Sequence, residues 1–209
     1  MIIGATVYST CNGGAGAQYD FTDLNESGGS LSVSPTSDSP ICEGEILNLY
    51  ANPSGTGATG ASFLWTGPNG FTATTSDATV SGLAQGDYTY TVTITDSAGN
   101  TNTKSVTAIV LATPQITSTT PGSRNGSGTV LLNAMASSGV LNWFSNASGG
   151  SSLGTGFTFM TPSISATTTF YVEASENGCV SARVPVMATI NGVTDVIINP
   201  RITYRVKIN

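Results

Sequence analysis

Turn signals recur about every eight to twelve residues along most of this chain, and this spacing constrains its fold more than any other feature. The stretches NPSGTGATG, GPNG, SGLAQGD and DSAGN are followed further on by SSG, NASGG, TG and ENG. Between them lie short alternating runs such as ILNLY (46–50), SFLWTG (62–67) and YTYTVTIT (88–95). Short strands separated by turns at this spacing are typical of a β-sandwich.

The same pattern of runs occurs twice. TVLLNAM (129–135) corresponds to ILNLYAN, VLNWF (140–144) to SFLWT, and TTFYVEAS (168–175) to YTYTVTIT. Trp65 and Trp143 occupy the same place in the two copies. The chain is therefore expected to contain two domains of one plan.

The boundary between the copies is the stretch LATPQIT, in which Pro114 ends one strand run and precedes the next. We predict an all-β fold of two tandem immunoglobulin-like β-sandwiches, with an N-terminal arm and a C-terminal strand extension. The predicted parts are the arm (residues 1–30), sandwich 1 (31–111), sandwich 2 (112–191) and a C-terminal β tail (192–209).

Composition narrows the range of partners. Charged residues make up 9% of the chain and the net charge is −6. Six Lys and Arg in 209 residues cannot neutralise many phosphates, so we expect no nucleic-acid partner. No apolar run approaches the length of a membrane span, so we expect no membrane insertion.

The residues that most often carry catalysis are missing or scattered. Histidine is absent, which removes Ser-His-Asp and Cys-His arrangements and the commonest zinc ligand. The twelve acidic residues mostly adjoin turns, and no carboxylate pair of the glycosidase kind stands out. Asp96 and Asn100 in DSAGN offer far fewer oxygens than calcium takes, so a plain turn is expected there. We predict no enzymatic activity, no metal and no cofactor.

Four aromatic residues are predicted to belong to the structural core. Trp65 and Trp143 each lie mid-strand between apolar neighbours, so burial is expected, with sugar stacking as the alternative. Tyr88 follows Gly-Asp at the start of a strand and is placed like a tyrosine corner. Tyr171, on the corresponding strand of the second copy, is predicted to be a core residue as well.

The residues of both copies resemble known repeats. PICEGEILNLYANPSGTGATGASFLWTGPNGF, followed by GDYTYTVTITDSAGN, is similar to the PKD-like and immunoglobulin-like repeats of Bacteroidetes surface proteins. LNWF, SGGSSLGTG and TPSISATTTFYVEA resemble a companion immunoglobulin-like repeat of the same proteins. The resemblance implies β-sandwich domains of large adhesins and gliding-associated proteins, which are exported by the type IX secretion route.

This resemblance also bears on the cysteines. It implies one cysteine in the opening strand and another late in each repeat, but Asn100 and Asn125 stand at two of those four places. Cys42 and Cys179 remain, and we predict both to be buried free thiols. A bridge between Cys42 and Cys179 across the two domains is expected to be geometrically unfavourable, and pairing of Cys11 with either stays open.

Two expectations bear on where the protein is located. The start MIIGATVYSTCNGG does not have the pattern of a secretion signal, and predicted free thiols suit a reducing compartment. By fold-level analogy, we predict a structural protein of a bacteriophage virion (a capsid decoration, head fibre or tail component) that adheres weakly to cell-surface glycans. The alternative is a segment of a secreted Bacteroidetes adhesin or an extracellular filament subunit.

The C-terminal tail has a strand pattern of its own. Its apolar positions alternate with basic or polar ones, which gives a strand one apolar and one basic face. A lone strand is not stable in water, so the tail must add to a sheet of its own chain or of a neighbour. We predict that it contacts other subunits of a virion or filament through Arg201, Ile202, Tyr204, Arg205, Val206 and Lys207.

Overall fold

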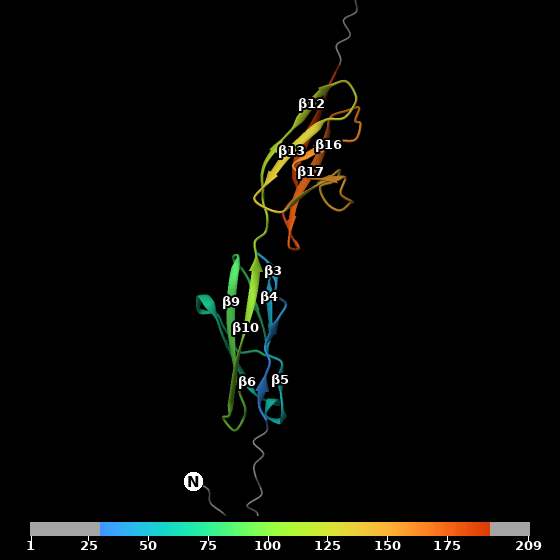
Figure 1. Ribbon diagram of the computed structural model, residues 1–209. Coiled ribbons are helices and arrows are strands. Elements are labelled where there is room, and N and C mark those ends of the chain that lie inside the picture. Colours follow the sequence, from blue (N-terminus) through green and yellow to red (C-terminus); the bar gives the residue numbers. More distant parts are fainter. Residues whose placement is uncertain (1–29, 193–209) are drawn as a thin grey trace, which may run out of the picture. The chain divides into compact units, whose positions relative to one another are not determined.

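The computed structural model describes residues 30–192, and the chain divides between Leu111 and Ala112 into two compact units. This division lies at the boundary expected from the sequence. Each unit consists of strands joined by turns (Figure 1), so the predicted all-β fold class is confirmed. The predicted tail and nearly all of the predicted arm fall outside the described residues.

Sandwich 1 packs a three-stranded sheet against a five-stranded one (Figure 1). The smaller sheet has the order β2 (Thr36–Ser37), β4 (Leu47–Tyr50), β8 (Asp77–Val80). The larger sheet has the order β3 (Ile41–Cys42), β10 (Thr101–Leu111), β9 (Gly86–Thr95), β6 (Ser62–Thr66), β7 (Thr72–Ala73). A separate pair, β1 (Ser32–Val33) with β5 (Pro53–Ser54), and two 3-10 turns, η2 (Thr56–Ala58) and η3 (Pro68–Gly70), complete the unit.

Alternation along β9 separates the core of sandwich 1 from its surface. Tyr90, Val92 and Ile94 are buried, because every second side chain of a strand points to the same face. Trp65 on β6 lies opposite Val92 and is fully buried, as predicted. The rest of this core comprises Val33, Ile41, Leu47, Leu49, Ala51, Ala78, Leu83, Ala108 and Val110.

Sandwich 2 repeats the plan (Figure 1). Its smaller sheet has the order β11 (Ile116–Thr120), β13 (Leu131–Ala136), β16 (Thr158–Met160). Its larger sheet has the order β12 (Gly122–Asn125), β19 (Val184–Asn191), β17 (Thr168–Glu176), β14 (Val140–Phe144), β15 (Gly154–Thr155), and β18 (Cys179–Val180) also pairs with β17.

Aromatic rings fill the centre of sandwich 2. Trp143 is fully buried, as predicted, and stacks on Phe159 with 5.1 Å between ring centroids. Phe159 in turn meets the edge of Phe170 at 5.6 Å. Offset stacking and edge contacts of this kind add to the free energy gained by burying the rings.

The prediction that Tyr171 is a core residue is wrong. Phe170 is 3% exposed and belongs to the core, whereas Tyr171 is half-buried on the outer face of β17. It lies opposite Phe144 on one side and Pro185 on the other. Because successive side chains of a strand point to opposite faces, shifting the inward position by one residue exchanges core for surface.

Candidate functional site

The outer face of the larger sheet in sandwich 1 is covered by hydroxyl groups. The residues of β9 that alternate with its core side chains are threonines, and β10 places Ser or Thr opposite them. On the other side of β9, the outward positions of β6 and β7 continue the pattern, apart from Leu64. We call this surface the hydroxyl face; its residues are Ser62, Thr66, Thr72, Thr89, Thr91, Thr93, Thr95, Thr101, Thr103, Ser105 and Thr107.

Hydrogen bonds link the hydroxyls across strands. The Oγ1 atoms of Thr89 and Thr107 are 3.1 Å apart, and those of Thr93 and Thr103 are 2.9 Å apart. Between them, Thr91 Oγ1 lies 2.8 Å from Ser105 Oγ. Each hydroxyl can donate one hydrogen bond and accept two, so a hydroxyl paired in this way keeps capacity for a ligand or for water.

No residue of the hydroxyl face carries a charge. Asp87 lies beyond its end, where it faces Ile109 across the strands. A neutral surface of hydroxyls and threonine methyls offers hydrogen bonds and small apolar contacts, and it exerts no long-range attraction. The period-two threonines were visible in the sequence as TYTVTIT and TNTKSVT, although we did not interpret them as a site.

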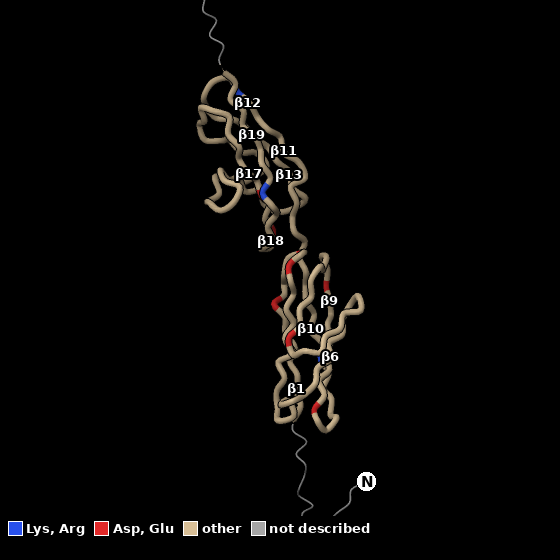
Figure 2. Tube along the Cα trace, turned by 180° about the vertical axis from the view of Figure 1, so that it is seen from behind, with Lys and Arg blue, Asp and Glu red and all other residues tan. Residues whose placement is uncertain are grey.

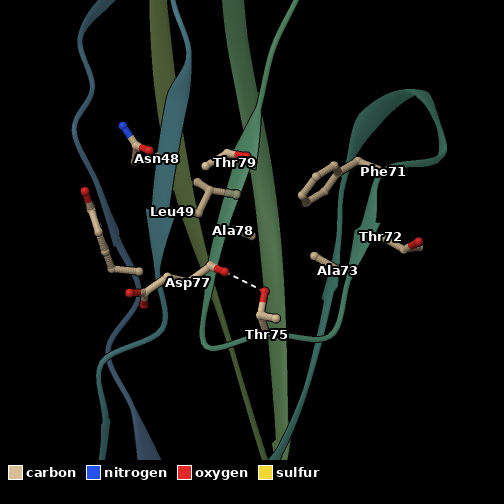
Figure 3. Close-up of a pocket in the computed structure, with 10 residues that line it drawn as sticks. Asn48, Leu49, Phe71, Thr72, Ala73, Thr75, Asp77, Ala78 and Thr79 are labelled. Carbon is tan, nitrogen blue, oxygen red and sulfur yellow. Dashed lines mark hydrogen bonds between the residues drawn. The ribbon is translucent and has the colours of Figure 1, made fainter.

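A pocket of about 340 Å³ opens beside the hydroxyl face, between the free edge strand β8 of one sheet and β7 of the other. Figure 3 shows Leu49 and Phe71 on opposite sides of this space, with Ala73 and Ala78 between them. Its polar lining includes Thr75, whose Oγ1 donates a 2.5 Å hydrogen bond to the carbonyl oxygen of Asp77. The lining thus mixes apolar side chains with polar ones, which also include Asn48, Thr72, Asp77 and Thr79.

The pocket exists because sandwich 1 has a small side chain where sandwich 2 has a ring. Ala78 lies opposite Leu49 in register, and Phe159 lies opposite Leu132 at the corresponding place. Phe159 fills the centre of sandwich 2 by stacking on Trp143. Sequence reasoning missed this site, because it follows from a pairing register that only the structure provides.

Neither tryptophan is available for sugar stacking, which was the alternative in the sequence. The indole N–H of Trp65 donates to the carbonyl oxygen of Ser76 at 3.3 Å, and that of Trp143 to Gly156 at 3.0 Å. Both side chains are fully buried. Tyr88 forms the predicted tyrosine corner, because its hydroxyl donates to the carbonyl oxygen of Ala84 at 3.0 Å.

Asp96 stabilises a turn, as expected. One carboxylate oxygen accepts hydrogen bonds from the backbone N–H groups of Ala98 and Asn100, and the other accepts one from the Asn100 side chain. The Asn100 amide, helped by these N–H donors, lowers the pKa of the Asp96 carboxyl from its usual 3.8. Within residues 30–192, no group of three or more His, Cys, Asp or Glu could hold a metal ion.

In sandwich 2, Arg183 is the most connected side chain on the outer face of the larger sheet. Its guanidinium lies 3.4 Å from the ring centroid of Phe144 and forms a 2.8 Å ion pair with Glu173. It also donates to the carbonyl oxygens of Asn146 and Gly149, at 2.9 and 2.7 Å. These contacts hold the 145–150 loop against the sheet and cover Phe144, so their role is structural.

The cysteines differ from the sequence-based expectation. Cys42 and Cys179 are both disulfide-bonded, so the prediction of free thiols is wrong. Cys179 is fully buried directly after Asn177 and Gly178, whose positive φ angles of 50° and 90° form the tight turn between β17 and β18. The expectation of free thiols rests on Asn100 and Asn125, which stand where the resemblance implies the partner cysteines.

Charge is distributed unequally between the parts of the chain. Figure 2 shows acidic positions along sandwich 1. Residues 30–111 contain Asp38, Glu43, Glu45, Asp77, Asp87 and Asp96 but only one basic residue, Lys104. In residues 112–192, Arg124 and Arg183 balance Glu173 and Glu176. Sandwich 1 is therefore an acidic domain and sandwich 2 a neutral one.

The sheets, the two cores and the tyrosine corner define a tandem protein of immunoglobulin-like β-sandwiches. Residues 40–110 match a family model described as a K319L-like PKD domain, and residues 112–191 match one described as a CHU_C-associated Ig-like domain. The two halves of the chain thus match models of PKD and immunoglobulin-like domains, the kinds of domain that the resemblance in its sequence implied. Domains of these kinds are generally non-catalytic and typically extracellular.

Several solved structures are similar. The fibronectin(III)-like modules of Clostridium thermocellum CbhA are 15% identical, over 84% of this chain and 100% of theirs, with a TM-score of 0.41. The PKD1 domain of the Vibrio cholerae metalloprotease PrtV is 26% identical, over 39% of this chain and 96% of its own, with a TM-score of 0.32. The insect immune protein hemolin is 12% identical, over 83% of this chain and 49% of its own, with a TM-score of 0.44.

No curated protein matches the sequence. None of the helical segments within residues 30–192 is long and apolar enough to cross a membrane.

Proposed function

We propose that this chain is a non-enzymatic, extracellular adhesion module that binds cell-surface glycans weakly through the hydroxyl face of sandwich 1. The observation that carries the proposal is the hydroxyl face itself, an uncharged surface of Ser and Thr with Leu64 as its exception. Glycans present the same chemistry, because each sugar offers several hydroxyl donors and acceptors.

Such a surface is suited to weak and repeated contacts. A hydrogen bond between a protein hydroxyl and a sugar hydroxyl replaces two bonds to water, so its net contribution is only about 1 kcal/mol or less. Many copies on one surface turn weak contacts into firm adhesion through effective concentration.

The extracellular location is supported by the disulfide-bonded state of Cys42 and Cys179. Disulfides persist in oxidising environments and are rare in a reducing cytoplasm. The virion prediction depended on free thiols. The disulfide-bonded cysteines instead support the alternative prediction, a segment of a surface adhesin or extracellular filament. A non-enzymatic role fits the hydrogen-bonding of Asp96 and the burial of both tryptophans.

The adhesion proposal is tested by placing charge on the hydroxyl face. Thr91→Lys and Thr93→Lys together should reduce retention of protein-coated beads on immobilised neutral cell-envelope polysaccharides at least tenfold, since the lysines break the row of hydroxyls. Thr158→Lys on the exposed face of β16 is the matched control and should leave retention unchanged. Equal retention by both variants, or no retention of the unaltered protein, would contradict the proposal.

The location is tested with a thiol-alkylating reagent that does not enter cells. In the protein at the surface of intact cells, Cys42 and Cys179 should react only after reduction, and peptide mapping without reductant should identify the partner of each. Alkylation of either cysteine before reduction would contradict the extracellular assignment. Recovery of the protein in purified phage particles rather than at the bacterial surface would favour the virion.

A further inference from the structure

The strand β8 of sandwich 1 has a free edge. Within the described residues, Asp77–Val80 pairs with β4 alone and is the last strand of its sheet. Alternate backbone N–H and C=O groups of an edge strand point away from the sheet, where they can pair with a further strand. The edge therefore offers a template for one more strand.

The pocket adjoins this free edge, so its lining determines which side chains an added strand should carry. Ala78 is buried and faces inward with Leu49, and the two side chains line the pocket together with Phe71 and Ala73. Asp77 and Thr79 are exposed on the same strand, and they too line the pocket. An added strand would therefore fit best with apolar side chains toward the pocket and basic side chains beside Asp77.

One segment of this chain has that pattern. From 201 to 208, Ile202, Tyr204, Val206 and Ile208 alternate with Arg201, Thr203, Arg205 and Lys207. The alternation predicts a strand with an apolar and a basic face. The basic residues also match the acidic character of sandwich 1, in which Lys104 is the only cation among residues 30–111.

We propose that residues 201–208 of a second copy of this chain add to the edge of β8 as a strand. Their apolar side chains enter the pocket, and their basic side chains lie beside Asp77. Main-chain hydrogen bonds to the edge supply affinity, and the fit of alternate side chains supplies specificity. Because the edge and the strand are different surfaces, each copy can bind one neighbour and be bound by another, which yields a head-to-tail chain.

We take a second copy as the source of the strand, because the tail is too short to run back along sandwich 2. β19 runs parallel to β12, so Asn191 lies level with Asn125, at the opposite end of the sandwich from Ile116. The run from Ile116 to Asn125 covers about 33 Å in extended strand. Residues 193–200 span at most about 27 Å, less than is needed to lead back to Ala112. Docking on another copy requires no such return.

The proposal is tested with a fluorescent peptide of residues 200–209 and a chain that ends at residue 192, which keeps every described strand of both sandwiches. The peptide should bind, and rising salt should weaken binding because charge pairs contribute. A peptide with Tyr204→Arg and Arg205→Tyr has the same composition but a broken alternation, and it should bind at least tenfold more weakly. Equal binding of the two peptides, or no binding, would overturn the proposal.

Variants of the chain locate the site. Asp77→Lys should weaken peptide binding at least tenfold, and Ala78→Phe should block it by filling the pocket. Asp87→Lys is the matched control, since it makes the same charge change on β9 of the other sheet, and it should change binding less than twofold. If Asp77→Lys and Asp87→Lys weaken binding equally, the attraction is a general effect of charge and the site is wrong.

An experiment on the full chain distinguishes docking on a second copy from docking within the same copy. A photo-reactive residue at position 204, in a mixture of isotopically light and heavy chains, should cross-link to residues 72–80 of the other isotopic form. Mass spectrometry identifies the linked peptides. Cross-links confined to chains of one isotopic form would show that the strand docks within its own copy and would overturn the assembly. The cross-linking result does not depend on glycan retention, so it tests the assembly separately from the proposed adhesion.

Discussion

The two sandwiches have one plan and one tryptophan position, but they fill the space beside it differently. In both, the indole N–H donates to a backbone carbonyl just before the strand that faces it, Ser76 before β8 and Gly156 before β16. Sandwich 2 then fills its centre with Phe159, whereas sandwich 1 has Ala78 and a pocket. The two domains thus share the buried tryptophan and differ at one inward-facing position, Ala78 or Phe159, which determines whether a pocket is present.

The surfaces of the two domains differ as well. Sandwich 1 is acidic and presents the hydroxyl face, whereas sandwich 2 is neutral and presents apolar side chains. On its smaller sheet Leu131 lies opposite Met160, and Leu131, Met135 and Met160 are each about half exposed.

The largest expected effect on stability comes from removing the tryptophan that both sandwiches bury. Trp65→Ala and Trp143→Ala should each lower the free energy of unfolding of their own sandwich by about 3–5 kcal/mol, since each deletes a fully buried ring. Chemical denaturation followed by circular dichroism measures the loss, and the fluorescence of the tryptophan that remains reports on the other, unaltered sandwich. A loss of stability in both sandwiches from one substitution would contradict their independence.

The next effect opens a space in sandwich 2 like the one in sandwich 1. Phe159→Ala should cost about 3 kcal/mol, because it removes the stacking on Trp143 and leaves a cavity. Thermal unfolding measures the loss, and Phe157→Ala is the matched control, because that ring is 63% exposed. Similar losses for both variants would show that Phe159 does not have the central role assigned to it.

A smaller effect is expected at Arg183. Arg183→Met keeps the aliphatic stem but loses the ion pair, the two carbonyl contacts and the contact with Phe144, at a cost of about 2 kcal/mol. Arg124→Met removes one exposed hydrogen bond and should cost less than about 0.5 kcal/mol. Faster hydrogen exchange in the 145–150 loop should accompany Arg183→Met alone, and an unchanged loop would refute the assignment.

The reverse change in sandwich 1 should be small and favourable. Ala78→Phe places a ring in the pocket, as Phe159 does in sandwich 2, and filling a space commonly raises stability by about 1 kcal/mol. The melting temperature of sandwich 1 measures this. A clear loss of stability would show that the backbones around the two positions differ more than their registers indicate.

The smallest effect is the pH dependence from Asp96. Its pKa is lowered in the folded state, so its contribution to stability is present above its unfolded pKa, near 4, and is lost as the pH falls through the lower folded value. Asp96→Asn should therefore destabilise sandwich 1 at pH 7, and the difference should shrink toward pH 2. Asn100→Ala removes the main donor and should reproduce this trend in denaturation at several pH values.

The features predicted from the sequence were those carried by local signals. Turn spacing and alternation gave the two sandwiches, and the Gly-Asp before Tyr88 gave the tyrosine corner. Tyr171 was misplaced because two adjacent aromatic residues leave the inward position undecided until the register is known. The pocket depends on a pairing between segments far apart in the sequence, and the disulfide-bonded state of Cys42 and Cys179 has no local signal either, so no local pattern could reveal them.

The hydroxyl face has a consequence for the conditions under which the protein can work. Ser and Thr hydroxyls do not titrate in the physiological range, and dissolved ions do not screen a hydrogen bond as they screen a pair of charges. Contacts made through Thr91, Thr93 and their neighbours should keep the same strength in fresh water and in brine, and in acidic and alkaline surroundings. The proposed adhesion through this face should therefore depend little on the salt and the pH of its surroundings.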